Sequence, residues 1–490
     1  MSTGTPASAA SHDLVGRHGQ GHGQSQSASR GQTPTASPGT APAKPKGSIS
    51  LLGGTAIGVG GMMGAGLYTL LGLAATTAGV WIPVAFIVGG AVAAFSVYSY
   101  AKLGARFPSR GGAGQFLIRC FGDTVVAGGL NMFQFLGWII AMSLYAVGFG
   151  GYAVSMLPFD APEWAAKAFG AGLVLLVVVI NLVGSKLVGR SEQFVIAIEL
   201  LILLAFIVAG LFKADPKFIF EEAGQGGMLG VLFAAGLLYV TYEGFGVVTN
   251  SAADMRNPSR ELPRAMYLSL IIVVAVYVVV STLVVTILSL PEVEQHQGHV
   301  LAEAGLSIFG KVGFVVIGAA ALLATASGVN ATLFGDANLA YMMARTGQLP
   351  REFQKKVWLG GTGGLFASAA LTIAFVAFFP LAAVGQMASL AFLIIYGAVS
   401  VGHIRVRTHT GAKLWPLVTA IGLNAALFAL LLGYTISTGP ASTWITLLVV
   451  FVLSFVLEYL VRRVTGRRLV ADPVERKLAR SGGEGGSTGR

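Results

Sequence analysis

Two apolar stretches of the sequence contain residues that could bind a charged solute inside a membrane. The stretch that comes later in the chain contains Glu243, which is followed directly by Gly244 and then, two residues further on, by Gly246. Each glycine weakens a helix by about 1 kcal/mol relative to alanine, so both stretches are predicted to be interrupted helices. The first stretch holds a cluster of five glycines: Gly58, Gly60, Gly61, Gly64 and Gly66.

An interrupted helix in lipid leaves backbone N–H and C=O groups that are tolerated only where they line a cavity or meet a ligand. N–H groups suit a carboxylate and carbonyl oxygens suit an ammonium group, so a zwitterion satisfies both. Close helix packing through small residues four apart, such as Gly60 and Gly64, is the structural alternative. A dinucleotide-binding fingerprint fits poorly, because it needs a preceding strand in a soluble βαβ unit.

A further carboxyl group, Glu199, follows Arg190 by nine residues, which places it about 13 Å into the membrane at helical rise. An ionised, unpaired acid at that depth costs several kcal/mol, so Glu199 is predicted to be protonated part of the time or paired with a cation. Either state suits coupling to an ion. The alternative, for Glu199 and for Glu243, is a carboxyl group hydrogen-bonded within the helix bundle for packing alone.

The elements that position these residues follow from composition. The chain has a mean hydropathy of +0.74, and its 490 residues are 54% apolar and 11% charged, which leaves too few charges for a soluble surface. Apolar runs of about 20 residues, the length that spans a bilayer, recur from Ile49 to Leu460. They do not alternate as the strands of an outer-membrane barrel would. The sequence therefore predicts an all-α integral membrane protein.

Twelve membrane-spanning helices are predicted between two tails. Residues 1–47 and 464–490 consist mainly of small and polar residues that cannot form a core, so both are expected to be disordered and cytoplasmic. The first apolar run is too long and too far from the start for a cleaved signal peptide. The predicted spans centre near Met63, Ala91, Trp138, Val177, Ile202, Val240, Val276, Val329, Ile373, Leu393, Leu423 and Val450.

The formal net charge of +11 does not indicate a nucleic-acid partner, because the basic residues follow membrane topology. Sixteen of the 32 Lys and Arg residues lie in loops after even-numbered spans, and twelve lie in the two tails or, as Arg462 and Arg463 do, at the end of the last span. This asymmetry predicts both termini in the cytoplasm of a multi-pass cytoplasmic (inner) membrane protein. Loops after odd-numbered spans hold only Lys167, Lys213, Lys217 and Lys311.

Cysteine and histidine give little sign of other chemistry. The single cysteine, Cys120, lies in a short cytoplasmic loop, so no intramolecular disulfide can form. His296 and His299 lie in an external loop without the further ligands that a metal site needs. Neither a metal site nor a cofactor is predicted. An enzyme is not expected, because no cluster of His, Cys or carboxylates has catalytic spacing near the spans.

The two glycine-rich spans occupy corresponding places in two halves of the chain. Phe245 follows Gly66 by 179 residues, and the two lie five spans apart, in the sixth and the first span. This pairing is typical of an inverted-repeat transporter with its substrate site at the membrane midplane. The predicted transporter domain covers residues 48–463: repeat one about 48–213, repeat two about 227–407 and two extra helices about 414–463.

Four motifs in order resemble the amino acid, polyamine and organocation (APC) superfamily of transporters. The segment NLVGSKLVGRSEQFVIAIELLIL is similar to broad-specificity, proton-driven amino acid permeases. The resemblance implies a LeuT-type 5+5 inverted repeat plus two C-terminal helices, with pocket walls from the third, eighth and tenth spans. The motifs are GGMMGAGLYTLLG (60–72), KLGARFPSRGGAGQF (102–116), YEGFGVVTNSAADMRNPSRELPRA (242–265) and DANLAYMMARTGQLP (336–350).

The resemblance also implies roles by position. The N–H groups of Ala65 and Gly66 would bind a substrate carboxylate at the positive end of a half-helix. The superfamily's sodium site falls between the first and eighth spans, and Glu199 stands where proton-driven relatives have a lysine that fills it. Gly64 and Gly244 complete the predicted substrate site. Carbonyl groups expected to bind the ammonium group belong to Met62, Val240, Thr241 and Glu243; the sodium-site positions are Gly60, Met63, Thr325 and Ser327.

A carboxyl group such as that of Glu199 can bind sodium or carry a proton. The sequence therefore predicts an uptake permease that works by alternating access, with an amino acid as substrate and H+ or Na+, with protons favoured, as coupling cation. Its other partner is the lipid bilayer. A potassium symporter that uses Glu199 and Glu243 as ligands, and an amino acid/polyamine exchanger on the same fold, are the alternatives; the oligomeric state is not predicted.

Overall fold

The computed structural model describes residues 49–63, 66–109, 112–183, 185–215, 217, 227–345, 347–358 and 360–465, with backbone alone at 185–193 and 465. Apart from residues 464 and 465, the two predicted tails lie outside these ranges. Nearly all of the described chain is helical, as predicted. Two short strands, β1 (Lys356–Trp358) and β2 (Gly361–Thr362), form an antiparallel hairpin.

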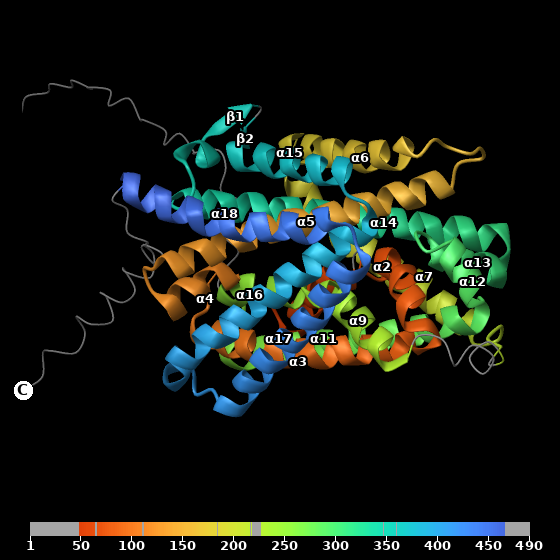
Figure 1. Cartoon of the computed structure of the whole chain (residues 1–490), viewed down its shortest axis with the longest axis horizontal. Helices are drawn as coiled ribbons and strands as arrows, with labels where there is room; N and C mark the ends of the chain where they lie inside the picture. Colours follow the sequence, from red (N-terminus) through yellow and green to blue (C-terminus); the bar gives the residue numbers. More distant parts are fainter. Residues whose placement is uncertain are drawn as a thin grey trace, which may run out of the picture. The chain divides into compact units, whose positions relative to one another are not determined.

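The helices, drawn in Figure 1, follow one another along the chain with short connections. In chain order they are α1 (Leu51–Met63), α2 (Gly66–Ala78), η1 (Gly79–Trp81), α3 (Ile82–Arg106), α4 (Gly112–Phe121), α5 (Val125–Ser155), α6 (Trp164–Val183), α7 (Ser185–Gly210), α9 (Gly227–Leu238), η2 (Tyr239–Tyr242), α10 (Phe245–Asn250), η3 (Ala252–Asp254), α11 (Pro258–Ile287), α12 (Leu290–Gln295), α13 (Val300–Phe309), α14 (Lys311–Arg345), η4 (Arg351–Gln354), α15 (Gly363–Phe378), α16 (Leu381–Thr410), α17 (Leu414–Thr438) and α18 (Ala441–Thr465).

Nine helices of the described chain are long and apolar enough to cross a membrane. Nine of the predicted span centres fall within these helices. The other three fall within shorter apolar helices, Leu51–Met63, Phe194–Gly210 and Gly363–Phe378. The prediction of a multi-span helical membrane protein is therefore confirmed, while the count of twelve stays a prediction.

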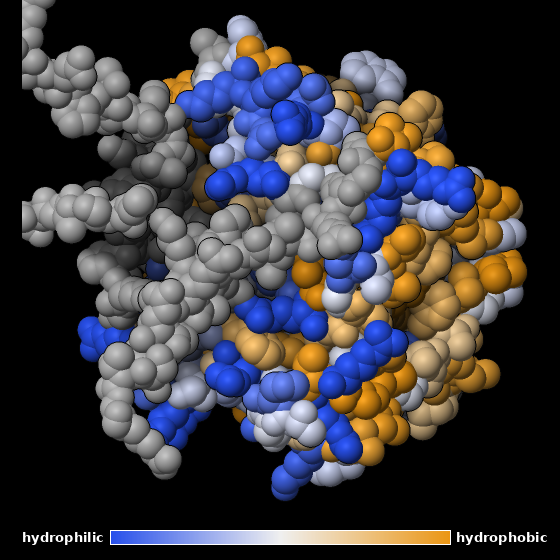
Figure 2. All heavy atoms as spheres, turned by 90° about the vertical axis from the view of Figure 1, so that its left-hand side faces the viewer, coloured by the Kyte–Doolittle hydropathy of each residue, from blue (hydrophilic) through white to orange (hydrophobic). Residues whose placement is uncertain are grey.

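Lipid-facing surfaces are visible as exposed apolar side chains. Leu175 of α6, Leu201 of α7, Val315 of α14 and Val449 of α18 are each more than half exposed, which a water-soluble surface of this extent would not tolerate. Figure 2 views the end of the molecule at which α4 lies, and shows hydrophilic residues gathered on that face with hydrophobic ones toward its edge. The bundle is thus apolar along its sides and polar at this end.

Of the two glycine-rich spans, the sixth is divided, whereas the middle of the first lies outside the described residues. The first consists of α1 and α2, and the intervening Gly64 and Ala65 lie outside the described residues. In the sixth span the α-helix α9 is followed by the 3-10 turn η2, and the next α-helix, α10, begins at Phe245. Its backbone is not extended: the N–H of Glu243 donates to the carbonyl of Val240 over 3.1 Å, as in any 3-10 turn.

The two glycine-rich spans run side by side in opposite directions. The first half of one packs against the second half of the other, α1 on α10 and α2 on α9. At one end, the N–H of Ile49 donates to the carbonyl of Asp254 over 3.1 Å, and Ile49 pairs with Met255 in an isolated parallel bridge. This arrangement brings the halves of the two spans together in the bundle interior.

Candidate functional site

The two glycine-rich spans meet at Gly61 and Gly244. A Cβ atom added to Gly61 would lie 3.2 Å from the carbonyl oxygen of Gly244, and one added to Gly244 would collide with the backbone of Gly61 and Met62. Real Cβ atoms are not found that close to a backbone, so Gly244 has no room for a side chain. The predicted site residue Gly244 therefore serves the approach of two backbones, which is the packing use of glycine in membranes.

A second close approach joins Gly66 to Thr241. A Cβ atom on Gly66 would lie 2.7 Å from the Cβ of Thr241, and both residues are buried. Gly66 is the first described residue of α2. The start of a half-helix is suited to bind a carboxylate. Gly64 and Ala65, predicted to share this role, lie outside the described residues.

The backbone carbonyls predicted to bind an ammonium group already accept hydrogen bonds. The carbonyl of Met62 accepts from the Tyr277 hydroxyl over 2.6 Å. That of Glu243 accepts from the N–H of Gly246 and from the Tyr396 hydroxyl, each over 3.0 Å. Two bonds fill the usual capacity of a carbonyl oxygen. The backbone oxygen of Glu243 is thus a weaker cation ligand than the sequence suggested.

The side chain of Glu243 is the better candidate for that role. It is 2% exposed, and its Oε1 accepts a 2.8 Å hydrogen bond from the Tyr145 hydroxyl. Its Oε2 is buried and has no hydrogen-bond partner among the described residues. A buried carboxyl oxygen without a partner costs free energy unless a proton or ligand meets it. Glu243 therefore presents an acceptor next to the Gly61–Gly244 contact.

Sequence reasoning missed the tyrosines that bind Glu243 and Met62, which are Tyr145, Tyr396 and Tyr277. Tyr145 comes from α5 and Tyr396 from α16, the third and tenth spans, which the superfamily resemblance named as pocket walls. Tyr277 comes from α11, which it did not name. On the third span, Gln134 is buried and Trp138 packs on Phe392. On the eighth span, Asn330 accepts a hydrogen bond from Asn181.

Glu199 of α7 is 3% exposed, and its Oε1 finds no hydrogen-bond partner in the part of the chain that is described. The phenol groups of Tyr68 and Tyr277 are its electrostatic neighbours. One helical turn earlier, Ile196 fills the space beside Gly60: a Cβ atom there would lie 3.1 Å from Ile196 Cγ1. Glu199 is thus carried on a helix that lies against the first span.

The predicted sodium-site residues lie on two helices in contact, α1 and α14. Met63 and Thr325 are buried, whereas Gly60 and Ser327 are half-buried. The Thr325 hydroxyl donates to the carbonyl of Ala321 over 2.7 Å, which leaves its oxygen lone pairs directed away from the helix. The helix that carries Glu199, α7, also packs against α14.

A third buried acid, Asp336 of α14, was not singled out from the sequence. It is 2% exposed; its Oδ2 accepts a 2.7 Å hydrogen bond from Ser368, and its Oδ1 lacks a partner among the described residues. A signal was present, because Asp336 precedes Arg345 by nine residues, the spacing that separates Glu199 from Arg190. Asp336 is therefore as far along the chain from a basic residue as Glu199 is.

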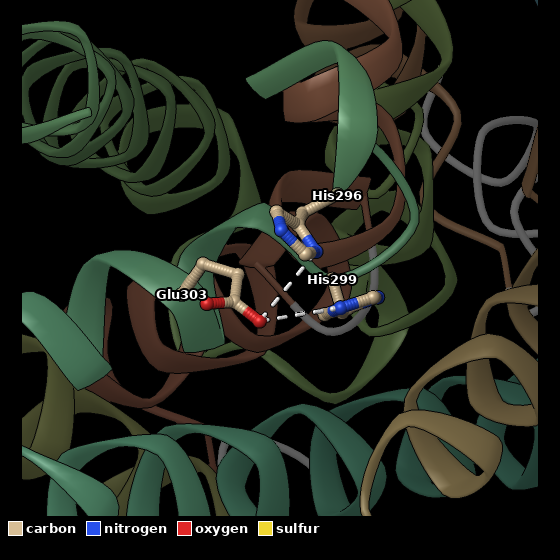
Figure 3. A group of neighbouring side chains, drawn as sticks. All are labelled: His296, His299 and Glu303. Atoms are coloured by element: carbon tan, nitrogen blue, oxygen red, sulfur yellow. Dashed lines mark ion pairs between the residues drawn. The ribbon is translucent and has the colours of Figure 1, made fainter. Parts of the chain in front are cut away.

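A separate polar cluster lies between α12 and α13 (Figure 3). Glu303 Oε1 is 3.6 Å from His296 Nδ1 and 3.5 Å from His299 Nε2. Burial, with a smaller effect from His296, lowers the pKa of His299 to about 4. At neutral pH the contact between His299 and Glu303 is therefore one of a neutral imidazole with a carboxylate. The sequence pointed to the two histidines but not to Glu303.

Comparisons with known proteins give consistent results. The profile of a family described as Amino acid permease matches residues 49–457. An uncharacterised protein of Methanocaldococcus jannaschii is 32% identical over 426 residues, or 86% of this chain and 96% of that protein. The inner membrane transport protein YbaT of Escherichia coli is 33% identical over 363 residues, or 73% and 84%. The branched-chain amino acid permease BcaP of Lactococcus lactis is 25% identical over 409 residues, or 76% and 86%.

Proposed function

Because the chain belongs to the amino acid permease family of the APC superfamily, we propose that it takes up amino acids by proton-coupled, alternating-access transport. The family and the names of the relatives indicate a transporter rather than an enzyme. The observation that carries the proposal is the buried, unpartnered Oε2 of Glu243 beside two backbones in contact. An acceptor at such a place suits the ammonium group of an amino acid.

The two ends of the substrate are held by different groups. Its carboxylate meets the N–H groups at the start of α2, where Gly66 lies and where the helix dipole favours a negative charge. Its ammonium group meets the Glu243 carboxyl group, with the Met62 and Val240 carbonyls as further acceptors. The net-neutral zwitterion thereby satisfies buried groups of both kinds, which lipid cannot do.

Glu199 supplies the coupling to protons. A carboxyl group this buried favours the protonated state, and it can release the proton when the surrounding helices move and water reaches it. Each symported proton contributes about 2.3 kcal/mol per 100 mV of membrane potential. That contribution is large enough to accumulate a net-neutral amino acid against its gradient.

Orientation and repeat structure form part of the same proposal. Both termini lie in the cytoplasm in this proposal, which the distribution of basic residues among the loops supports, and residues about 48–213 and 227–407 are the two inverted repeats, followed by α17 and α18. In transport, the first, second, sixth and seventh spans rock against the rest. The antiparallel packing of α1 on α10 and of α2 on α9 supports this division.

Uptake by proteoliposomes with an imposed pH gradient, inside alkaline, tests the proposal. A panel of twenty radiolabelled amino acids gives the substrate, and Glu199→Gln is expected to abolish the dependence of uptake on the gradient. Asp336→Asn is the matched control, since it neutralises another buried carboxyl group. Unchanged pH dependence in Glu199→Gln, together with its loss in Asp336→Asn, would move the coupling to Asp336.

The potassium-symporter alternative is tested by thermal shift. A ligand that binds only the folded protein raises its melting temperature with concentration. Stabilisation by amino acids supports the proposal, whereas stabilisation by potassium alone contradicts it.

A further inference from the structure

The α12–α13 hairpin connects α11 to α14 and lies at the end of the bundle opposite to α4 (Figure 1). Both of its helices pack against α2. The contact is close at Gly72 of α2, where an added Cβ atom would lie 2.7 Å from the Cα of Gln297. The hairpin therefore rests directly on the second half of the first span.

Three side chains of this hairpin converge at its turn (Figure 3). His296 follows the end of α12, His299 precedes α13, and Glu303 lies one helical turn after His299. One ligand atom from each residue lies within 4.8 Å of the other two. All three residues are half-buried, so the group is shielded from bulk water on one side and open to an ion on the other.

The distances fit a transition metal. A tetrahedral zinc ion with bonds of about 2.1 Å holds its ligand atoms about 3.4 Å apart. Glu303 Oε1 lies 3.6 Å from His296 Nδ1 and 3.5 Å from His299 Nε2. Side-chain rotation alone can close this arrangement around an ion. Two imidazoles and one carboxylate favour zinc over calcium or magnesium, which prefer oxygen ligands.

We propose that His296, His299 and Glu303 bind one Zn²⁺ ion on this hairpin, with water at the fourth position. The aromatic surroundings support the ring orientation: His299 packs edge-on against Tyr152 and Phe314, with centroids 6.5 Å and 6.3 Å away. Tyr152 in turn donates a 3.1 Å hydrogen bond to the carbonyl of Tyr68 in α2. The site is therefore linked to the first span through Tyr152 as well as through Gly72.

Bound zinc would stiffen the hairpin, because it joins the end of α12 to the first turn of α13. A stiffened hairpin that rests on α2 hinders the movement of that half-helix. Zinc added on the hairpin side is thus expected to slow uptake, a consequence that rests on the proposed transport function. Zinc binding itself does not depend on that function.

Binding is measured by calorimetric titration of ZnCl₂ into the purified full-length protein after chelator treatment and removal of any affinity tag. Loss of even an outer-sphere partner weakens metal sites by about 10–100-fold, so Glu303→Gln and His299→Ala are each expected to weaken one site at least tenfold. Glu294→Gln is the matched control, because Glu294 is an exposed acid of the same hairpin outside the cluster.

Histidines of the N-terminal tail, His12, His18 and His22, are present in every variant, so zinc that they bind cancels in the comparison. Equal zinc stoichiometry and affinity in wild type, Glu303→Gln and Glu294→Gln would overturn the proposal. Melting temperatures of the metal-free proteins show whether each variant is folded, and His299→Ala gives an independent result if Glu303→Gln is not.

The transport consequence is read separately in proteoliposomes. External zinc is expected to slow uptake by wild type and by Glu294→Gln but not by Glu303→Gln. Zinc that binds with no effect on uptake would contradict the effect on α2 while leaving the site intact. A protein that binds zinc but transports no amino acid would contradict the proposed function alone.

Discussion

The hydroxyl group of Tyr277 donates a 2.6 Å hydrogen bond to the carbonyl oxygen of Met62, next to the end of α1. Tyr277 also interacts electrostatically with Glu199. One side chain of α11 thus binds the end of α1 and has as its electrostatic neighbour the acid proposed for proton coupling. A change in the protonation of Glu199 can therefore reach the substrate site through a single residue.

Tyr277→Phe is expected to slow uptake by about two- to tenfold, because a hydrogen bond contributes about 0.5–1.5 kcal/mol. Tyr267→Phe is the matched control: Tyr267 lies on the same helix and donates to the carbonyl of Ala94 over 3.3 Å, away from the glycine-rich spans. The measurement is initial uptake rate per amount of protein in proteoliposomes. Equal rates for the two variants would show that the Met62 contact has no part in transport.

Gly244→Ala is expected to lower uptake by about 10–100-fold, because overpacking a close contact costs about 1–3 kcal/mol. The added methyl group would meet the backbone of Gly61. Gly246→Ala provides a control two residues away, where a Cβ atom would make ordinary contacts at 3.7 Å with Tyr396 and 3.9 Å with Tyr100. If both variants transport normally, the contact of the two spans is not needed.

The thiol of Cys120 is expected to resist modification in the folded protein. Burial raises its pKa to about 12, against a smaller opposing effect of Arg405, so almost none of it is thiolate at pH 8. Because thiolate is the reactive form, maleimide labelling should be on the order of 1,000-fold slower than for a free thiol. Denaturation in SDS should restore the rate.

The control for this labelling uses Ser437→Cys, at an exposed position, in a Cys120→Ser background. That thiol should react quickly under native conditions. Fast native labelling of Cys120 would mean that α4 opens often enough to expose it.

Arg462→Ala is expected to lower the melting temperature, because Arg462 joins α18 to the start of α5. Its guanidinium group contacts Asp123 at 2.7 Å and the fully buried Glu458 at 2.6 Å. Hydrogen bonds to charged groups contribute about 1.5–3 kcal/mol. The neighbouring Arg463→Ala, which removes only a contact 5.0 Å above the Tyr459 ring, should melt close to wild type; a reversed order would refute the assignment.

The membrane spans were predictable because hydrophobic length is a local property, and each predicted centre falls within an apolar helix. The glycines Gly244 and Gly246 also marked where the sixth span changes from α9 to the 3-10 turn η2 and then α10, whereas the interruption of the first span stays a prediction. What the sequence could not supply was the partner of each glycine. That Gly244 lies against Gly61, and Gly66 against Thr241, depends on how two distant spans pack, and no local pattern specifies it.

Side-chain direction was the second limit. Tyr145, Tyr277 and Tyr396 lie in apolar spans where an aromatic residue is unremarkable, and only the fold aims their hydroxyl groups at Glu243 and Met62. Glu303 was within reach of sequence reasoning, because it follows His299 by four residues, the spacing of neighbours on one helical face. The expectation of an external loop at these residues hides this spacing, because Glu303 lies in the first turn of α13.

The bridge between Ile49 and Met255 couples the two glycine-rich spans mechanically. Separating α1 from α10 would break the backbone hydrogen bond from Ile49 to Asp254. A movement of the two helices together leaves this hydrogen bond intact. In the proposed transport cycle, the lower-energy route is therefore a concerted pivot of both half-helices.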